Sequence, residues 1–301
     1  MQNTYDTYLR EMLVSPMDKE MRGRIRSYFQ SKHPNLSVSA IGRSIMSVDI
    51  EAYRVGEGRK SIAVFASHHA LESISSNVVY ALIGMLLDRE RLREPYGLDL
   101  SFILSRFSFW FVPCVNPDGV ELRLNSARES VLYERQMKMS GGDFSTWQAN
   151  ARGVDLNHNY SFRFDEYKRI EKERGISAGR SLFSGEYPES EPETHSVCNF
   201  IRTLMPIAVI SLHTQGEEIF VGANRADYFP LAHRLSGMIG YRVSCATDTA
   251  CYGGLCDYTA SIGIPSLTLE LGRGVNPLSD SDSLKIAAGI YRGIFSLPKL
   301  V

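Results

Sequence analysis

The sequence predicts an α/β fold, an α/β/α sandwich in which helices cover both faces of a buried central sheet. Short apolar runs typical of buried strands, such as residues 61–66 and 207–212, alternate with longer segments that have a helical pattern. The 301 residues contain no internal repeat and no long linker. We therefore expect one main domain at residues 36–301, preceded by an N-terminal helical segment at residues 1–35.

The expected strands are short apolar or β-branched runs bounded by turn residues: 36–41, 47–55, 61–66, 107–115, 207–212 and 266–271. The expected helices are longer periodic segments: one or two within 1–35, then 72–89, 191–204, 226–239 and 279–295. Pro192 suits the first turn of its helix, because no hydrogen bond is lost there. Residues 56–58 and 116–119 predict turns, and residues 120–190 predict a long, loop-rich excursion with several short elements.

The charge balance excludes some classes of function. Lys plus Arg number 33 and Asp plus Glu number 34, which argues against nucleic-acid binding by bulk electrostatics and against a polybasic membrane anchor. The longest apolar stretch, residues 78–87, is shorter than the roughly 18 residues that a membrane span needs. The first fifteen residues lack the apolar core of a secretory signal. We expect a cytoplasmic protein without a nucleic-acid or membrane partner, and the sequence leaves its oligomeric state open.

Candidate metal ligands follow the strand at residues 61–66. His69 and Glu72 leave this strand three positions apart, and imidazole and carboxylate both bind Zn²⁺ at about 2.0–2.2 Å. His68 is a weaker choice, because the residue three positions after it is Leu71. Such a pair also arises by chance. It stands, however, where α/β folds bind ligands, at the carboxyl end of a strand.

His213 is the candidate for a third ligand. Catalytic zinc commonly has three protein ligands and one open position. His213 directly follows the apolar run 207–212, which places it at the same edge of the sheet. A histidine at a strand end is also often a hydrogen-bonded structural residue, and this interpretation stays open.

Glu270 is the candidate for a general base. The strand 266–271 alternates strictly, so its leucines share one face while Glu270 points to the other. A buried glutamate needs a partner, and one interpretation is a structural ion pair with an arginine such as Arg273. The other is a carboxylate that takes the proton from the water attacking a carbonyl.

Five motifs occur in the order found in the zinc carboxypeptidase (M14) family, which this sequence resembles from about residue 36 to residue 295. They are HxxE (69–72), NPDG (116–119), GVDLN (153–157), HT (213–214) and TLEL (268–271). Within the family, HTQGEE (213–218) and IPSLTLELGRGVNPL (264–278) resemble the γ-D-glutamyl-L-diamino-acid endopeptidases. These bacterial enzymes cut peptidoglycan stem peptides between D-glutamate and a diamino acid such as meso-diaminopimelate.

The resemblance implies roles by position. One Zn²⁺ ion would be held by His69, Glu72 and His213, with Glu270 as the general base and Asn157 helping to hold the substrate carboxylate. The fold would be the single-domain, mixed-sheet sandwich of the zinc carboxypeptidases. Residues 36–301 would form its catalytic domain.

One departure from the family pattern lies at His158. Members that remove a C-terminal residue usually have an arginine there, which clamps the terminal α-carboxylate. A guanidinium forms a bidentate and permanently charged bond to carboxylate, whereas an imidazole cannot. We therefore expect a different carboxylate geometry or use as an endopeptidase. His158 is then either a neutral packing residue or a pH-dependent carboxylate contact.

The oxyanion position and the substrate-capping tyrosine also depart. The family usually places arginine or lysine directly after a tryptophan, to stabilise the tetrahedral intermediate. Here Gln148 follows Trp147, and it can donate a hydrogen bond but brings no charge. Arg152 is either its replacement or a surface arginine. Tyr252 is the candidate for the capping tyrosine, with Thr249 as an alternative occupant of the matching position.

The function expected from this sequence is zinc-dependent hydrolysis of γ-D-glutamyl–diamino-acid bonds in muropeptide-derived peptides. One alternative is an ordinary metallocarboxypeptidase or amidase acting on another peptide. Another is a peptide-binding pseudoenzyme that does not cleave. The chain contains no GxSxG elbow, Walker-A loop or Rossmann fingerprint, which argues against a serine hydrolase of that type and against nucleotide binding.

Overall fold

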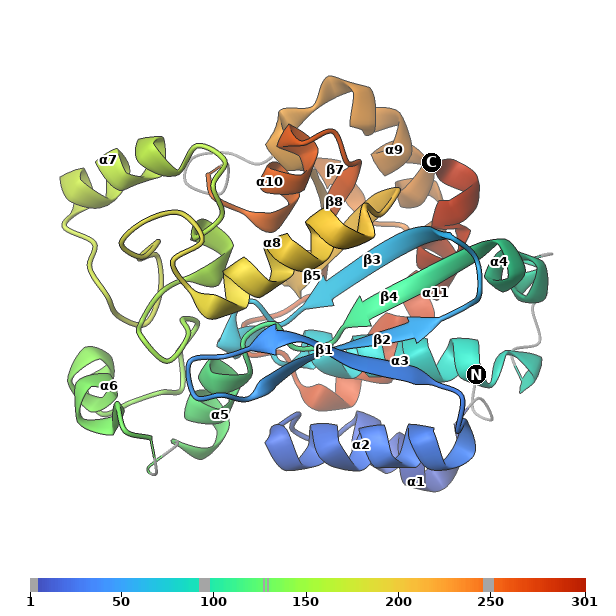
Figure 1. The fold of residues 1–301 in the computed structure, drawn as a ribbon, viewed down its shortest axis with the longest axis horizontal. Coiled ribbons are helices and arrows are strands. Elements are labelled where there is room, and N and C mark those ends of the chain that lie inside the picture. Colours follow the sequence, from blue (N-terminus) through green and yellow to red (C-terminus); the bar gives the residue numbers. More distant parts are fainter. Residues whose placement is uncertain (1–4, 92–97, 127, 129, 246–251) are drawn as a thin grey trace.

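The structure is a computed structural model that describes residues 5–91, 98–126, 128, 130–245 and 252–301. Its centre is an eight-stranded sheet in the order β1-β2-β4-β3-β5-β8-β6-β7 (Figure 1). The strands are β1 (Ser37–Arg43), β2 (Asp49–Val55), β3 (Lys60–Ala66), β4 (Phe107–Val112), β5 (Ala208–Thr214), β6 (Glu218–Val221), β7 (Arg242–Ser244) and β8 (Ser266–Leu271). β4, β3, β5 and β8 run parallel, while β2 and β6 run antiparallel to their inner neighbours. The predicted α/β fold with a mixed sheet is confirmed.

Both faces of the sheet are covered, because its central strands are apolar on both sides. In β3, Ile62, Val64 and Ala66 belong to one hydrophobic cluster, while Ala63 and Phe65 belong to another. The first cluster packs against α1 (Thr7–Leu13), α2 (Lys19–Lys32), α3 (Ile74–Leu87), α9 (Phe229–Ile239) and α11 (Ser283–Leu300). The second packs against α8 (Pro192–Leu204) and α10 (Leu255–Ser261).

The carboxyl ends of β3, β5 and β8 meet at one edge of the sheet, as parallel neighbours in register. The excursion between β4 and α8 carries α5 (Pro117–Asn125), α6 (Tyr133–Ser140) and α7 (Phe164–Arg174), which lie on the left in Figure 1. The predicted turn at 116–119 is instead the start of α5. Asn116 caps this helix by accepting a hydrogen bond of 2.9 Å from the Gly119 N–H, and Pro117 occupies its first turn.

Four short elements were not predicted, and several element ends differ from the prediction. These elements are α4 (Leu100–Arg106), α10, β6 and β7. β6 and β7 contain only four and three residues, so neither is long enough to show a periodic pattern. None of the described helices combines the length and the hydropathy that a bilayer-spanning segment needs.

The N-terminal helices contribute to the main core. Leu9 on α1 is 1% exposed and Phe29 on α2 is equally buried, and both join the cluster beneath the sheet. Asp6 and Asp18 begin these helices by accepting hydrogen bonds from the backbone N–H groups of Leu9 and Met21. The division at residue 35 stays a prediction.

Replacing Leu9 tests this packing. Leu9→Ala should lower the free energy of unfolding by about 2–5 kcal/mol, since it leaves a cavity in a closed cluster. Urea denaturation measures the change. Glu11→Ala, on the exposed side of the same helix, is the matched control and should change stability by less than about 0.5 kcal/mol. Equal effects of the two changes would contradict the packing described.

Candidate metal centre and active site

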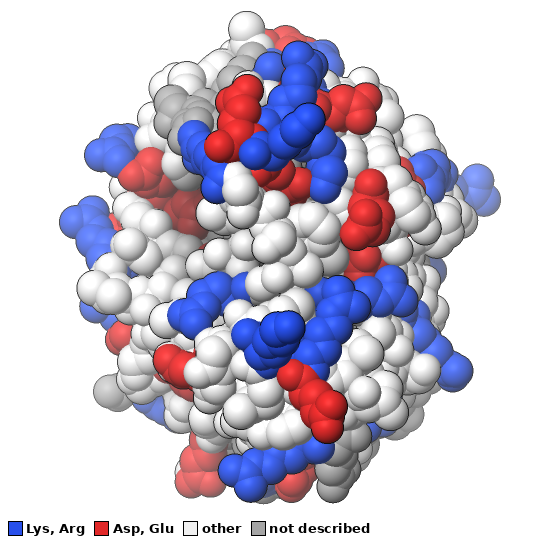
Figure 2. Space-filling view, turned by 90° about the vertical axis from the view of Figure 1, so that its left-hand side faces the viewer, with Lys and Arg blue, Asp and Glu red and all other residues white. Residues whose placement is uncertain are grey.

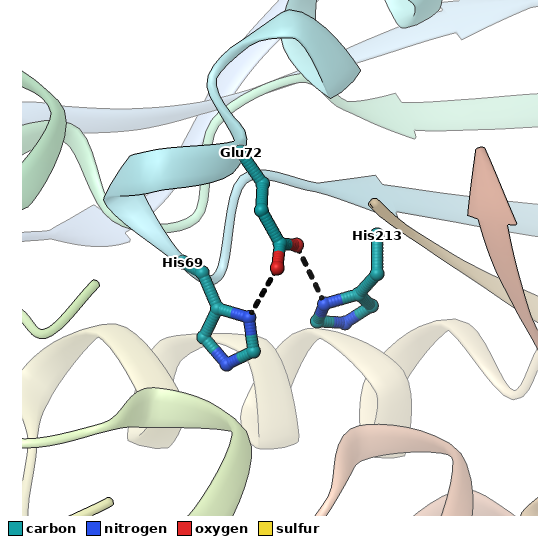
Figure 3. A group of neighbouring side chains, drawn as sticks. All are labelled: His69, Glu72 and His213. Atoms are coloured by element: carbon teal, nitrogen blue, oxygen red, sulfur yellow. Dashed lines mark hydrogen bonds and ion pairs between the residues drawn. The ribbon is translucent and has the colours of Figure 1, made fainter. Parts of the chain in front are cut away.

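Side chains from two distant parts of the sequence converge on one point. His69 Nδ1 lies 3.0 Å from Glu72 Oε1, and His213 Nδ1 lies 3.0 Å from Glu72 Oε2 (Figure 3). One ligand atom from each residue lies within 4.8 Å of the others. All three side chains are buried or nearly so, with His69 the most exposed. The predicted set of metal ligands is therefore brought together.

The turn after β3 is fixed by neighbouring backbone. Ser67 adopts the left-handed region, with a φ of 52°, and its carbonyl accepts a hydrogen bond of 3.0 Å from the Asn116 N–H. The Asn116 side chain also donates to the carbonyls of His68 and Ala149, at 2.9 and 3.1 Å. One asparagine thus caps α5 and ties the ligand-bearing turn to residues 148–150. His213 needs no such device, because it lies within β5.

Each imidazole has a second partner that orients it. His69 Nε2 lies 3.1 Å from Asp155 Oδ1, and His213 Nε2 lies 3.1 Å from Ser211 Oγ. A carboxylate that accepts the Nε2 proton leaves the Nδ1 lone pair facing the group, which is how metal-binding histidines are usually held. Sequence reasoning gave no role to Asp155. The sequence shows only that an acidic residue lies within GVDLN; in the structure its side chain is 1% exposed and so requires a partner.

These residues fit a catalytic zinc ion. Two imidazole nitrogens and one carboxylate form a set of three protein ligands that leaves a fourth position open. His68 does not join them: its Nε2 shares a hydrogen bond of 2.9 Å with the Tyr160 hydroxyl, and its ring stacks on His213. Burial, followed by the neighbouring His213 and His69, holds the pKa of His68 well below its usual value. His68 is therefore a neutral neighbour of the group.

Protonation in the metal-free group follows from its charges. Burial disfavours the charged forms, but the charges of His69 and His213 outweigh it and hold the pKa of Glu72 well below its usual value. The carboxylates of Glu72 and Asp155 likewise hold the pKa of His69 well above its usual value, against the effect of burial. A buried negative charge already faces both imidazoles. A divalent cation bound between the three side chains would compensate this negative charge.

Glu270 lies beside this group, on the neighbouring strand. In the parallel register of β5 and β8, Glu270 is opposite His213, so both side chains leave the same face of the sheet. Burial, and then the negative charge of Glu72, raise the pKa of Glu270 to about 8. Arg273 pairs with Glu217 at 2.6 Å. Among the described residues, no lysine or arginine lies within ion-pair distance of Glu270, so the structural ion pair considered for it is not found.

His158 is held as a packing residue. Its ring stacks on Tyr167, with centroids 4.1 Å apart and planes 8° apart, and its Nδ1 donates to the Tyr252 carbonyl at 2.8 Å. A carbonyl only accepts, so Nδ1 carries a proton, and both this atom and one ring face are engaged within the protein. The structure therefore favours the packing interpretation of His158.

The remaining predicted residues divide into two groups. Gln148 lies next to the ligand turn, since its carbonyl accepts from the Ala70 N–H at 2.9 Å. Asn157 lies next to Asp155, whose side chain accepts from its backbone N–H. Arg152 instead pairs with Glu191, with its Nη1 3.6 Å from Glu191 Oε2.

Tyr252 is half-buried, and its ring and hydroxyl contact Arg163. Thr249, the alternative for the matching position, lies outside the described residues.

Comparisons with known proteins agree with this geometry. A model of the zinc carboxypeptidase family, Peptidase_M14, matches residues 25–273. The γ-D-glutamyl-L-diamino acid endopeptidase 1 of Lysinibacillus sphaericus is 28% identical over 274 residues, covering 87% of this chain and 68% of that protein. Murein peptide amidase A of Escherichia coli (strain K12) is 32% identical over 105 residues, or 34% of each chain. The crystal structure of thrombin activatable fibrinolysis inhibitor has the same fold, with a TM-score of 0.76 at 17% identity over 98% of this chain and 76% of that one.

Asp155 gives a test of the metal site. Asp155→Asn should weaken zinc binding by about 10- to 100-fold, because the carboxylate that orients His69 is lost. Competition with a chromophoric chelator measures the dissociation constant. Asp165→Asn, an exposed change in the first turn of α7, is the control and should leave it unchanged. Identical zinc affinities of wild type and Asp155→Asn would count against the assigned support.

The raised pKa of Glu270 predicts a pH dependence of the metal-free protein. Between about pH 4.5 and pH 8 the folded protein keeps a proton on Glu270 that the unfolded chain has lost. The contribution of Glu270 to the free energy of unfolding is therefore greatest at low pH and is lost as the pH rises through this window. Glu270→Gln removes the titration, so its stability relative to wild type should be greater at pH 8 than at pH 5 in urea denaturation without metal. A difference that does not change with pH would contradict the burial assigned to this carboxyl.

Proposed function

Since the chain belongs to the zinc carboxypeptidase (M14) family and is a metallopeptidase, we propose that it hydrolyses γ-D-glutamyl–diamino-acid bonds in peptidoglycan-derived peptides. The observation that carries the chemistry is the position of Glu270, which lies beside the three metal ligands without a cationic partner among the described residues. A carboxyl beside the metal ligands that is not itself a ligand is suited to receive a proton and to return it.

The chain's own residues define most of the reaction. When bound by His69, Glu72 and His213, the zinc ion supplies a Lewis acid that polarises the scissile carbonyl and makes water more acidic. Glu270 takes the proton from the attacking water and returns it to the leaving amine when the C–N bond breaks. Gln148, at the position next to the ligand turn, offers a neutral hydrogen-bond donor for the carbonyl oxygen.

Two kinds of observation support the substrate class. One relative, which covers 87% of this chain, is a γ-D-glutamyl-L-diamino acid endopeptidase, and another, which covers 34% of it, is a murein peptide amidase. The motifs at 213–218 and 264–278 carry the same resemblance. His158 adds a structural reason, since a stacked imidazole in place of the usual arginine does not suit ordinary removal of a C-terminal residue. A cytoplasmic site of action on imported muropeptides is part of this proposal.

Glu270→Gln tests the mechanism. On L-Ala-γ-D-Glu-meso-diaminopimelate, release of diaminopimelate should fall by about 10²–10⁴-fold in kcat/KM, since the proton acceptor is lost. The zinc content of the variant, measured by elemental analysis, should stay at one ion per chain. Undiminished cleavage by this variant would show that the assigned base is wrong.

A peptide panel separates the alternatives. The same tripeptide with an α-linked glutamate is the matched control substrate and should be cleaved far more slowly. Preference for the α-linked peptide would identify an ordinary metallocarboxypeptidase. Zinc binding without turnover of any peptide would identify a peptide-binding pseudoenzyme.

A further inference from the structure

A buried guanidinium on α2 lacks a carboxylate partner. Arg22 is 9% exposed, and its Nη1 donates to the Met17 carbonyl at 2.8 Å. This is its only hydrogen bond, and no carboxylate among the residues that the structure describes lies within ion-pair distance of it. A guanidinium keeps its charge in proteins and carries five N–H groups. Burying such a charge without a counter-ion is costly, so Arg22 is suited to receive an anion.

Arg22 lines a cavity between α2, α5 and the turn that joins β1 to β2 (Figure 1). The cavity has two lobes, of about 870 and 530 Å³, and both Arg22 and Val48 line each of them. None of the three metal ligands lines either lobe, and neither does Glu270. Volumes of this size are typical of sites that hold small molecules.

Three acidic residues that line this cavity already serve other groups. Asp18 caps α2 by accepting from a backbone N–H of its first turn at 2.8 Å, and Glu121 accepts from the Lys19 N–H at 3.1 Å. Asp118 accepts from a serine hydroxyl and from a backbone N–H in the turn between β1 and β2, at 2.7 and 2.9 Å. Each of these carboxylates is held by a bond to another group, which leaves Arg22 without a close counter-ion.

A buried acceptor without a donor lines the smaller lobe. Gln136 on α6 is fully buried, and its Nε2 donates to the Ala151 carbonyl at 3.0 Å. Its Oε1 has no hydrogen-bond partner in the described part of the chain. Buried polar atoms are almost always hydrogen-bonded, so a missing partner calls for an explanation. A ligand N–H group that reaches this oxygen would supply the missing bond.

The charges along the cavity favour a ligand with little net charge. Acidic and basic residues line the two lobes in nearly equal number. The neighbouring surface is also mixed: Figure 2, which faces the left side of Figure 1, shows lysines and arginines interspersed with acidic residues. Such a mixture creates no strong positive field that would concentrate multiply charged anions. A ligand with one carboxylate and with N–H donors therefore suits this cavity better.

We propose that this cavity binds an amino acid or short peptide, with its carboxylate on Arg22 and an N–H group on Gln136 Oε1. A planar guanidinium pairs with a carboxylate through two parallel hydrogen bonds. The ligand thus supplies both the anion that Arg22 lacks and the donor that Gln136 lacks. The site does not include the metal ligands, and the inference does not depend on which peptide bond the enzyme cleaves.

Four probes test the two contacts by calorimetric titration of the zinc-loaded protein. They are glycylglycine, its C-terminal amide, inorganic phosphate, and hexanoate, which carries a carboxylate but no N–H group. Wild type should bind glycylglycine about 10-fold more tightly than each of the other three, because only glycylglycine makes both contacts.

Two variants assign the contacts to their residues. Arg22→Met should weaken the binding of glycylglycine by about 10- to 100-fold and leave that of the amide unchanged, since the charged pair is lost. Gln136→Met should weaken the binding of glycylglycine by about 10-fold and leave that of hexanoate unchanged. Val48→Phe keeps both residues and adds a ring at a position that lines both lobes. It should also weaken glycylglycine binding, and it replaces either variant that does not fold.

A control on another helix separates this role from general effects. Arg10 on α1 is exposed and lines neither lobe, so Arg10→Met should change no affinity. Every variant should keep one zinc ion per chain, which shows that the fold is intact. Equal affinity of wild type for glycylglycine and its amide, or an unchanged affinity for glycylglycine in Arg22→Met or Gln136→Met, would overturn the inference. Tighter binding of phosphate than of glycylglycine would overturn it as well.

Discussion

The candidate metal site depends on one buried carboxylate that faces two imidazoles. Glu72 is 5% exposed and has one oxygen 3.0 Å from each of His69 and His213. Burying a charge is costly unless it is paired, so the surrounding chain has to supply positive charge at this point. A divalent cation held between these side chains would supply that positive charge. The hydrogen bonds of Asp155, Ser211 and Asn116 keep the three ligand side chains directed at that point.

The parallel centre of the sheet is what allows such distant residues to meet. β3, β5 and β8 are neighbours in register, so residues that follow or end them arrive at one edge. This places the turn with His69, the end of β5 with His213, and the end of β8 with Glu270 in a row. Only the last of these lacks a partner of opposite charge among the described residues, which suits it to exchange protons.

Sequence patterns predicted site residues where a chemically reactive residue lies on or directly after a strand with a regular apolar pattern. The alternation of β8 placed Glu270 opposite its leucines, and apolar runs located β3 and β5 closely enough to predict the metal ligands. The patterns did not predict features that depend on contacts between residues or on side-chain capping, which a local pattern does not show. The turn-like 116–119 segment starts a helix because Asn116 caps it. Asp155 acquires its importance only from its contact with His69, which no local pattern links to it. Arg152, a candidate for the oxyanion role because it lies close to Gln148 in the sequence, instead pairs with Glu191.

Anomalous diffraction at the zinc edge, from crystals of zinc-loaded protein, tests the central claim most directly. The account predicts one strong peak per chain, within about 2.0–2.2 Å of the Nδ1 atoms of His69 and His213 and of a Glu72 oxygen. A peak elsewhere in the chain, or no peak between these three side chains at full zinc loading, would contradict it.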